Sequence, residues 1–285
     1  MISTASGGPK WYNNSMATFP SQTPNPAAPC GSAPRRPLAV WLAGRIGWDD
    51  YARLAEGLAG QVSGAGGIAA PQGRDPTLVI FELEPCITIG RLGSRADVSL
   101  ADDDLRAHRL DVRFTGRGGG AVLHGPGQVC VALFAALEDL GLGRDDVGTY
   151  LARFRSGLVA ALVALRCGPR IDGGSHDVRG RTGLLAALGV AVRRGAASHG
   201  AFVNVCPAIE LHQHVVTARP AGAAELTMSS LQADLQRRVR LPDARAALVR
   251  HMAEAFLFSR THVHSGFPRM VPAGRGREEV ASRVG

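Results

Sequence analysis

Short apolar runs and longer stretches of helical periodicity alternate in blocks along most of this chain. Runs rich in β-branched and aromatic residues predict strands at 38–43, 77–84, 86–90, 111–115, 183–194 and 201–206. Apolar residues three and four apart predict helices at about 48–58, 102–110, 147–165, 229–238 and 243–257. Because strands and helices do not strictly alternate, the pattern favours an α+β domain with a mixed, largely antiparallel sheet flanked by helices.

The two ends lack this periodicity. Residues 1–36 are rich in Pro, Ser, Asn and Gly, so we expect a disordered tail there, and a second one at 259–285. A single domain is expected at 37–258. Within it, two apolar runs flank Gly125-Pro126-Gly127, and this spacing predicts a β-hairpin around the turn.

Composition narrows the class of protein. No apolar stretch is long enough for a transmembrane helix and the N-terminus lacks a signal-peptide pattern, so we expect a cytoplasmic protein without membrane contact. The formal net charge is +8, and Lys10 is the only lysine. The arginine excess fits either a GC-rich genome or an acidic partner. Because the basic residues form no block, nucleic-acid binding is not expected.

One candidate for ligand chemistry is the segment "TGRGGGAVLHGPGQ", residues 115–128. Three consecutive glycines after a strand allow backbone amides to approach a ligand closely. Arg117 offers a forked cation for a phosphate or carboxylate, and His124 and Gln128 flank the Gly-Pro-Gly turn. Taken alone, the segment also fits a glycine-rich hairpin without a ligand.

A second candidate is "LGVAVRRGAASHGAFVNV", residues 188–205. It reads as a strand that ends in a basic turn, followed by His199-Gly200 and another strand. Taken alone, it also fits an ordinary hairpin with a histidine in its turn.

Taken together, the two segments resemble the motifs of protein octanoyltransferases, and "ELEPCITIGR" at 82–91 resembles the early Glu-x-x-Pro-x-x-Thr-x-Gly motif of that family. The resemblance implies the fold of the biotin and lipoate protein ligases and no cofactor. It implies transfer of an octanoyl group from octanoyl-acyl carrier protein to a lysine of a lipoyl domain. The acceptors would be lipoyl domains of 2-oxoacid dehydrogenase or glycine cleavage proteins.

The resemblance also assigns an acyl pocket. The matching residues are Arg117, Gly118, Gly119, Gly120, Ala121, Val122, Leu123, His124, Ala187, Leu188, Gly189, Gly200, Ala201 and Phe202. Many of these side chains are small and would leave room for a thin aliphatic chain, whose burial stabilises binding by about 0.8 kcal/mol per methylene.

The residues that perform the family's chemistry are missing. Family members form a thioester on a cysteine beside a lysine, and the matching positions here are Leu184 and Ala218. No shift of the alignment supplies a lysine, because Lys10 lies in the expected tail. Arg181 is near, but a guanidinium stays protonated and cannot act as a base. The same loss argues against an ATP-dependent lipoate ligase.

Two hypotheses follow. The first is a degenerate octanoyltransferase that binds an acyl chain or an acylated protein without turnover. The second is an active enzyme with a relocated nucleophile, for which Cys206 is the best candidate, with His199, His212 or His214 as activator. His212 and His214 would share a face if extended, but no third or fourth metal ligand is evident, so we expect no metal site.

Overall fold

The computed structural model describes residues 36–63, 75–171, 176–218 and 224–268. Its strands are β1 (Leu38–Ile46), β2 (Thr77–Leu83), β3 (Cys86–Ile89), β4 (Asp111–Phe114), β5 (Ala121–His124), β6 (Gln128–Ala136), β7 (Val178–Arg179), β8 (Leu184–Arg193), β9 (Ala196–Asn204) and β10 (Thr261–Ser265). The expected strands are all present, although β9 begins earlier than the sequence suggested.

The helices are α1 (Trp48–Ser63), α2 (Asp102–Ala107), α3 (Val147–Ala164), α4 (Leu231–Leu235) and α5 (Leu241–Ala255). Each expected helix is present, although α4 spans only five residues of the expected 229–238. Asp146 caps α3 by accepting a hydrogen bond from the Thr149 amide, which fixes the start of that helix. Within the described residues, none of these helices combines the length and the apolarity that crossing a membrane requires.

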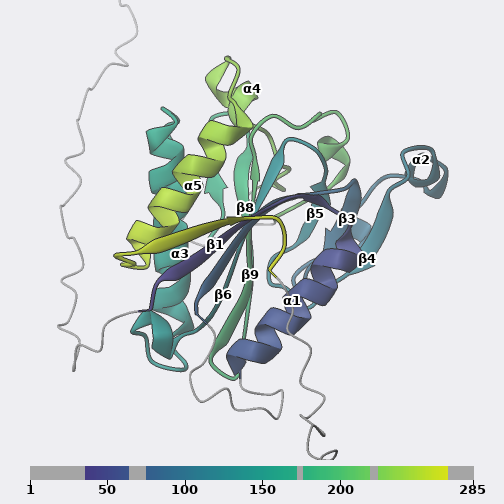
Figure 1. Ribbon diagram of the computed structural model, residues 1–285. Coiled ribbons are helices and arrows are strands. Elements are labelled where there is room, and N and C mark those ends of the chain that lie inside the picture. Colours follow the sequence, from purple (N-terminus) through teal and green to yellow (C-terminus); the bar gives the residue numbers. More distant parts are fainter. Residues whose placement is uncertain (1–35, 64–74, 172–175, 219–223, 269–285) are drawn as a thin grey trace, which may run out of the picture. The chain divides into compact units, whose positions relative to one another are not determined.

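The large sheet has the strand order β10-β1-β2-β6-β9-β8-β7 (Figure 1). Strands β1 and β2 are parallel because α1 carries the chain back across the sheet between them. Most of the other pairings are antiparallel. Helices α3 and α5 cover one face of the sheet and α1 covers the other. The mixed, largely antiparallel α+β architecture is therefore confirmed.

A small second sheet, in the order β4-β3-β5, carries residues 86–89 of the early motif on β3 and residues 121–124 of the glycine-rich segment on β5. Its outer face packs on a separate apolar cluster that includes Leu105 of α2 and Val215. The sheet thereby places the end of β3 directly beside the glycine run.

The expected hairpin around Gly125-Pro126-Gly127 is wrong. Strand β5 pairs with β3 in the small sheet, whereas β6 pairs with β2 and β9 in the large one. The turn carries the chain from one sheet to the other. Glu82 stabilises it by accepting a hydrogen bond of 2.8 Å from the Gly127 amide, and Gly127 adopts a φ of +88° that favours glycine.

The expected domain boundary at residue 258 is too early. Strand β10 pairs in parallel with β1 over Leu38–Leu42, and Trp41 stacks on His264 at 4.5 Å. Its side chains are exposed, so the sequence carries little apolar signal for a strand there. The remaining parts of the two expected tails, 1–35 and 269–285, lie outside the described residues.

Candidate functional site

The two motif segments lie against each other. The Gly118 amide donates a hydrogen bond of 2.9 Å to the Val190 carbonyl of β8. A Cβ on Gly118 would lie 2.7 Å from that same oxygen, and one on Gly119 would lie 2.7 Å from the Leu188 carbonyl. Gly119 also has a φ of +74°. Glycine is therefore required because the loop backbone packs directly on the backbone of β8.

Arg117 points into the protein. Its side chain is 1% exposed, with the guanidinium carbon 5.0 Å above the ring of Phe202. It donates to the Thr88 hydroxyl, the Thr88 carbonyl and the Gly118 carbonyl at 2.7–2.8 Å. A Cβ on Gly189 would lie 3.0 Å from the Arg117 Cδ. The guanidinium is thus bound within the protein, where the sequence suggested a site for a ligand phosphate or carboxylate.

A chain of buried polar groups continues from Arg117. The Thr88 hydroxyl lies 2.7 Å from His124 Nε2, and His124 Nδ1 lies 2.6 Å from Gln128 Oε1. Gln128 then donates to Asn204 Oδ1 at 2.8 Å. Since Gln128 Oε1 can only accept, His124 Nδ1 carries the proton and Nε2 accepts from Thr88. Burial and the nearby Arg117 charge lower the pKa of His124 to about 3, so the imidazole is neutral.

Tyr51 and His199 form a second polar contact beside this chain. The Tyr51 hydroxyl lies 2.8 Å from His199 Nδ1, and its ring stacks on Phe81 at 4.6 Å. Burial lowers the pKa of His199 to about 4. His199 lies within β9 with a φ of +61°, so it belongs to a strand irregularity and not to the expected turn.

The residues expected to form the acyl pocket divide among several environments. Val122, Ala187 and Phe202 share the cluster under α1, with Arg117, His124 and Gly189 beside Phe202. Gly118, Gly119 and Gly120 form the loop that packs on β8 and Thr217, and the others lie elsewhere. Leu188 and Ala201 face the α3 and α5 layer, a Cβ on Gly200 would meet Phe154 of α3, and Ala121 and Leu123 pack under the small sheet. Alternate side chains of a strand point to opposite faces, so consecutive residues cannot all line one pocket.

Leu184 and Ala218, the two positions that the sequence resemblance matched to the family's lysine and cysteine, come together in space. The Leu184 amide donates to the Thr227 carbonyl at 3.2 Å, and the Ala218 amide donates to the Leu226 carbonyl at 3.1 Å. Leu184 and Ala218 are thus held by neighbouring residues of one extended segment, 226–228. Both also pack in the apolar cluster under α1, which includes Met228. The fold therefore holds these two positions close together, but both side chains are hydrocarbon and offer neither a nucleophile nor a base.

Cys206 follows β9 by two residues and packs against the cluster under α3 and α5. It lines a cavity of about 700 Å³ with His124 and His212, among other residues. Burial and the carboxylate of Glu82 raise the pKa of the Cys206 thiol. His212 and His214 belong to a turn of 3-10 helix, so they do not form the extended pair considered above, and His214 contacts Ser99 at 3.2 Å.

Burial also raises the pKa of each of the other thiols that the structure describes. The pKa rises to about 12 for Cys86 and about 11 for Cys167, and well above its usual range for Cys130. A thiolate is the nucleophile in cysteine chemistry, and a raised pKa removes it at neutral pH. Cys30 lies outside the described residues.

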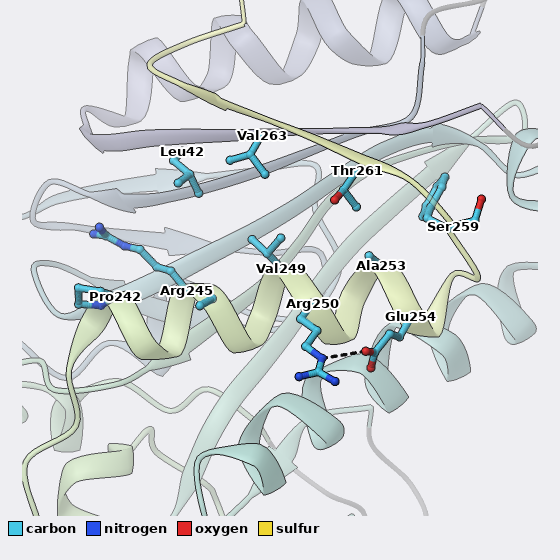
Figure 2. A pocket seen from close by; sticks show the side chains of 12 residues that line it. Leu42, Pro242, Arg245, Val249, Arg250, Ala253, Glu254, Ser259, Thr261 and Val263 are labelled. Atoms are coloured by element: carbon cyan, nitrogen blue, oxygen red, sulfur yellow. Dashed lines mark hydrogen bonds and ion pairs between the residues drawn. The ribbon is translucent and has the colours of Figure 1, made fainter.

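A separate groove of about 620 Å³ lies between α5 and β10 (Figure 2). Val249 and Ala253 of α5 and Val263 of β10 point into it, and Arg250 pairs with Glu254 at its side at 2.9 Å. It lies on the α5 face of the sheet, opposite the cluster that holds Leu184 and Ala218.

Sequence reasoning gave no site role to Thr88, Tyr51 or Met228. Thr88 was part of the early motif, and a threonine inside an apolar strand is a usable signal for a buried hydrogen bond. Tyr51 looked like an ordinary apolar position of an amphipathic helix. Met228 precedes a predicted helix, and nothing in its spacing indicated a contact with Leu184.

Comparisons with known proteins agree with this geometry. The family described as the lipoyl protein ligase A/B catalytic domain matches residues 69–253. An octanoyltransferase of Citrifermentans bemidjiense is 34% identical over 199 residues, covering 67% of this chain and 84% of its own length. The crystal structure of lipoate-protein ligase A bound with ATP superposes with a TM-score of 0.60 at 16% identity, covering 80% of this chain and 88% of its own.

A second structural relative is the bi-partite lipoate protein ligase of Thermoplasma acidophilum, whose structure comes from an analysis of this ligase and its E2 lipoyl domain. It superposes with a TM-score of 0.55 at 17% identity and covers 81% of this chain and 88% of its own. At such identities the two structural relatives establish a common fold only.

Proposed function

We propose that this chain, which belongs to the octanoyltransferase family of lipoate biosynthesis, binds a protein-borne octanoyl or lipoyl group without transferring it. The acyl donor would be octanoyl-acyl carrier protein, and the second partner would be a lipoyl domain. The residues proposed to contact the chain are those around Phe202, on the side of the sheet that α1 covers.

The observation that supports this proposal is the apolar replacement of both family positions. Leu184 and Ala218 are joined through the segment 226–228, as a reacting pair would have to be. In the family's reaction a thiolate attacks the acyl carbonyl and expels the carrier thiol. An amine of the lipoyl domain then attacks the enzyme thioester. Alanine has no nucleophile for the first step, and leucine cannot accept or deliver a proton.

Binding without turnover remains compatible with the rest of the site. The glycine run, Arg117 and His124 keep the close backbone contacts described above. Leu184 pairs with Arg179 of β7 and Ala218 bridges to Leu226, so the backbone of both positions is held in the fold. Leucine and alanine instead extend the apolar surface that a hydrocarbon chain would contact.

The test is to incubate the purified full chain with octanoyl-acyl carrier protein and a lipoyl domain. Calorimetry or fluorescence anisotropy should detect binding of the octanoylated carrier. Intact-mass spectrometry should show no octanoyl adduct on the chain and none on the lipoyl domain. Efficient octanoylation of the lipoyl domain, or failure to bind the acylated carrier, would overturn the proposal.

Restoring a lysine and a cysteine at positions 184 and 218 tests whether the reaction centre of the family lies there. The variant Leu184→Lys/Ala218→Cys should acquire an octanoyl adduct on residue 218, because a lysine beside the new thiol lowers its pKa. The matched control Leu184→Lys/Ala218→Ser should acquire none. A folded cysteine variant that binds the carrier but gains no adduct would place the reaction centre elsewhere.

The alternative nucleophile, Cys206, is tested in the same assay. If an adduct does form on the wild-type chain, the Cys206→Ser variant should lose it under the relocated mechanism. The raised pKa of this thiol favours the binding function instead, and Cys206 packs against the cluster under α3 and α5, not against the one that holds Leu184.

A further inference from the structure

The rim of the glycine segment carries two large apolar side chains that face solvent. Leu92 is 85% exposed and Phe114 is 71% exposed, the two highest values among the large hydrophobic residues that the structure describes. Large apolar side chains gathered at one site usually mark a contact surface. Here they lie at the edge of a motif that the proposed function already uses.

Backbone pairing places these two residues beside the same loop. Phe114 ends β4 and lies opposite Ile89, the last residue of β3. Leu92 follows β3 by three residues, and its amide donates to the Gly119 carbonyl at 3.0 Å. Both side chains are therefore attached to strands and loops that border the glycine run.

Two arginines extend this surface. Arg91 is exposed, and its amide donates to the Arg117 carbonyl at 3.0 Å. Arg193, at the end of β8, is also exposed, and its guanidinium would lie 3.0 Å from a Cβ on Gly116. Leu92, Phe114, Arg91 and Arg193 together are called the rim patch below.

The rim patch has uncompensated positive charge. Neither Arg91 nor Arg193 forms an ion pair with any residue in the described part of the chain. The acidic residues at the base of β4 are engaged elsewhere, because Arg113 pairs with Asp111 at 2.9 Å and approaches Asp49 to 3.9 Å. The whole chain also carries a formal charge of +8.

We infer that the rim patch docks the acidic carrier protein that bears the acyl thioester. This inference rests on the proposed function and names the surface for its donor. Complementary charge would steer an acidic protein to the two arginines, and Leu92 and Phe114 would lose their exposure in the complex. Docking there would place the carrier at the border of the glycine segment.

The experiment measures association of octanoyl-acyl carrier protein with the full chain by stopped-flow fluorescence at several salt concentrations. The variant Arg91→Glu/Arg193→Glu should slow association about tenfold at low salt and flatten its dependence on salt. The variant Leu92→Ser/Phe114→Ser should instead raise the dissociation rate, by about tenfold, and leave the salt dependence unchanged.

The matched control is Arg260→Glu. Arg260 is exposed, makes no ion pair with a described residue and precedes β10, which five strand spacings, about 24 Å, separate from β8 in the sheet. This control should associate nearly as fast as the wild type. The control changes the net charge by two and the arginine rim variant by four. If the control slowed association by about half as much as the rim variant on a logarithmic scale, or by more, net charge alone would explain both losses and the inference would be overturned.

A second ligand separates this inference from the proposed function. Octanoyl-pantetheine, which lacks the protein, should bind the wild type and both rim variants equally. If the wild type binds neither ligand, the proposed function fails. If octanoyl-pantetheine binds but the rim variants keep full affinity for the carrier, only the docking surface is wrong. If they lose a lipoyl domain but keep the carrier, the patch belongs to the acceptor and this assignment is overturned.

Discussion

Thr88 is the side chain on which the buried polar chain of the site depends, and the variant Thr88→Val tests that role. Valine keeps nearly the same volume but removes the hydroxyl. Thr88 is 0% exposed. Its hydroxyl accepts hydrogen bonds from Arg117 Nε at 3.2 Å and from Arg117 Nη2 at 2.7 Å, and it lies 2.7 Å from His124 Nε2. The substitution therefore removes three hydrogen bonds without opening a cavity.

The expected cost follows from the charge of the donor. Burial lowers the pKa of Arg117 to about 10, so its guanidinium remains charged at neutral pH. A hydrogen bond to a charged group contributes about 1.5–3 kcal/mol and a neutral one about 1 kcal/mol. Arg117 keeps its bonds to the Thr88 and Gly118 carbonyls. Counting the two contacts from Arg117 as one shared charged hydrogen bond, and adding the neutral one to His124, we expect Thr88→Val to lower the free energy of unfolding by about 2.5–4 kcal/mol.

The assay is urea-induced unfolding at pH 7, followed by tryptophan fluorescence. Thr77→Val is the matched control, because Thr77 is likewise buried but its hydroxyl donates to one neutral carbonyl, that of Asp75, at 2.9 Å. It should lose only about 1 kcal/mol. The double variant Thr88→Val/Arg117→Met should cost at least about 2 kcal/mol less than the sum of its single changes. Equal costs for the two threonines, or strict additivity, would refute the reasoning.

Two further predictions concern the same site. Burial holds the pKa of His124 at about 3, below its value near 6.5 in an unfolded chain, so the unfolded chain binds more protons between these values. Stability should therefore fall as the pH drops below about 6.5, by about 1.4 kcal/mol per pH unit from this residue. Urea midpoints at pH 7, 6 and 5 should show a shallower dependence in His124→Asn, and an unchanged slope would contradict the assignment. In Gly120→Ala, the new Cβ would lie 2.4 Å from the Thr217 carbonyl, whereas a Cβ on Gly125 meets nothing within 4 Å. Thermal unfolding should show a loss of about 1–3 kcal/mol for Gly120→Ala and almost none for Gly125→Ala, and similar losses in both would count against close packing.

Local patterns predicted individual elements well where one face is apolar. The helix at 147–165 is α3, because its buried residues Tyr150, Phe154 and Leu158 recur at helical spacing. The same reasoning missed β10, whose residues are all exposed and whose position depends on pairing with β1. Because backbone hydrogen bonds to β1 mainly hold this strand in place, it needs few buried apolar side chains, and the apolar pattern of the sequence does not predict it.

The local pattern of apolar residues could not predict which sheet each strand joins. The runs on either side of Gly125-Pro126-Gly127 look like a hairpin, since the turn residues and strand lengths suit one. The chain instead changes sheets there, because β6 pairs with β2 and β9. Which strand lies beside another depends on contacts between residues far apart in the sequence, and no window of neighbouring residues contains that information.

The sequence by itself determined the family, the glycine motifs and the absence of a lysine at position 184, because these depend only on residue identity and order. Only the tertiary structure decided that Arg117 turns inward onto Thr88 and that Leu184 and Ala218 meet across the segment 226–228. The physical reason is that a side chain's direction and partners are set by the packing of distant strands. A residue's chemical type fixes what it can do, and the fold fixes what it can reach.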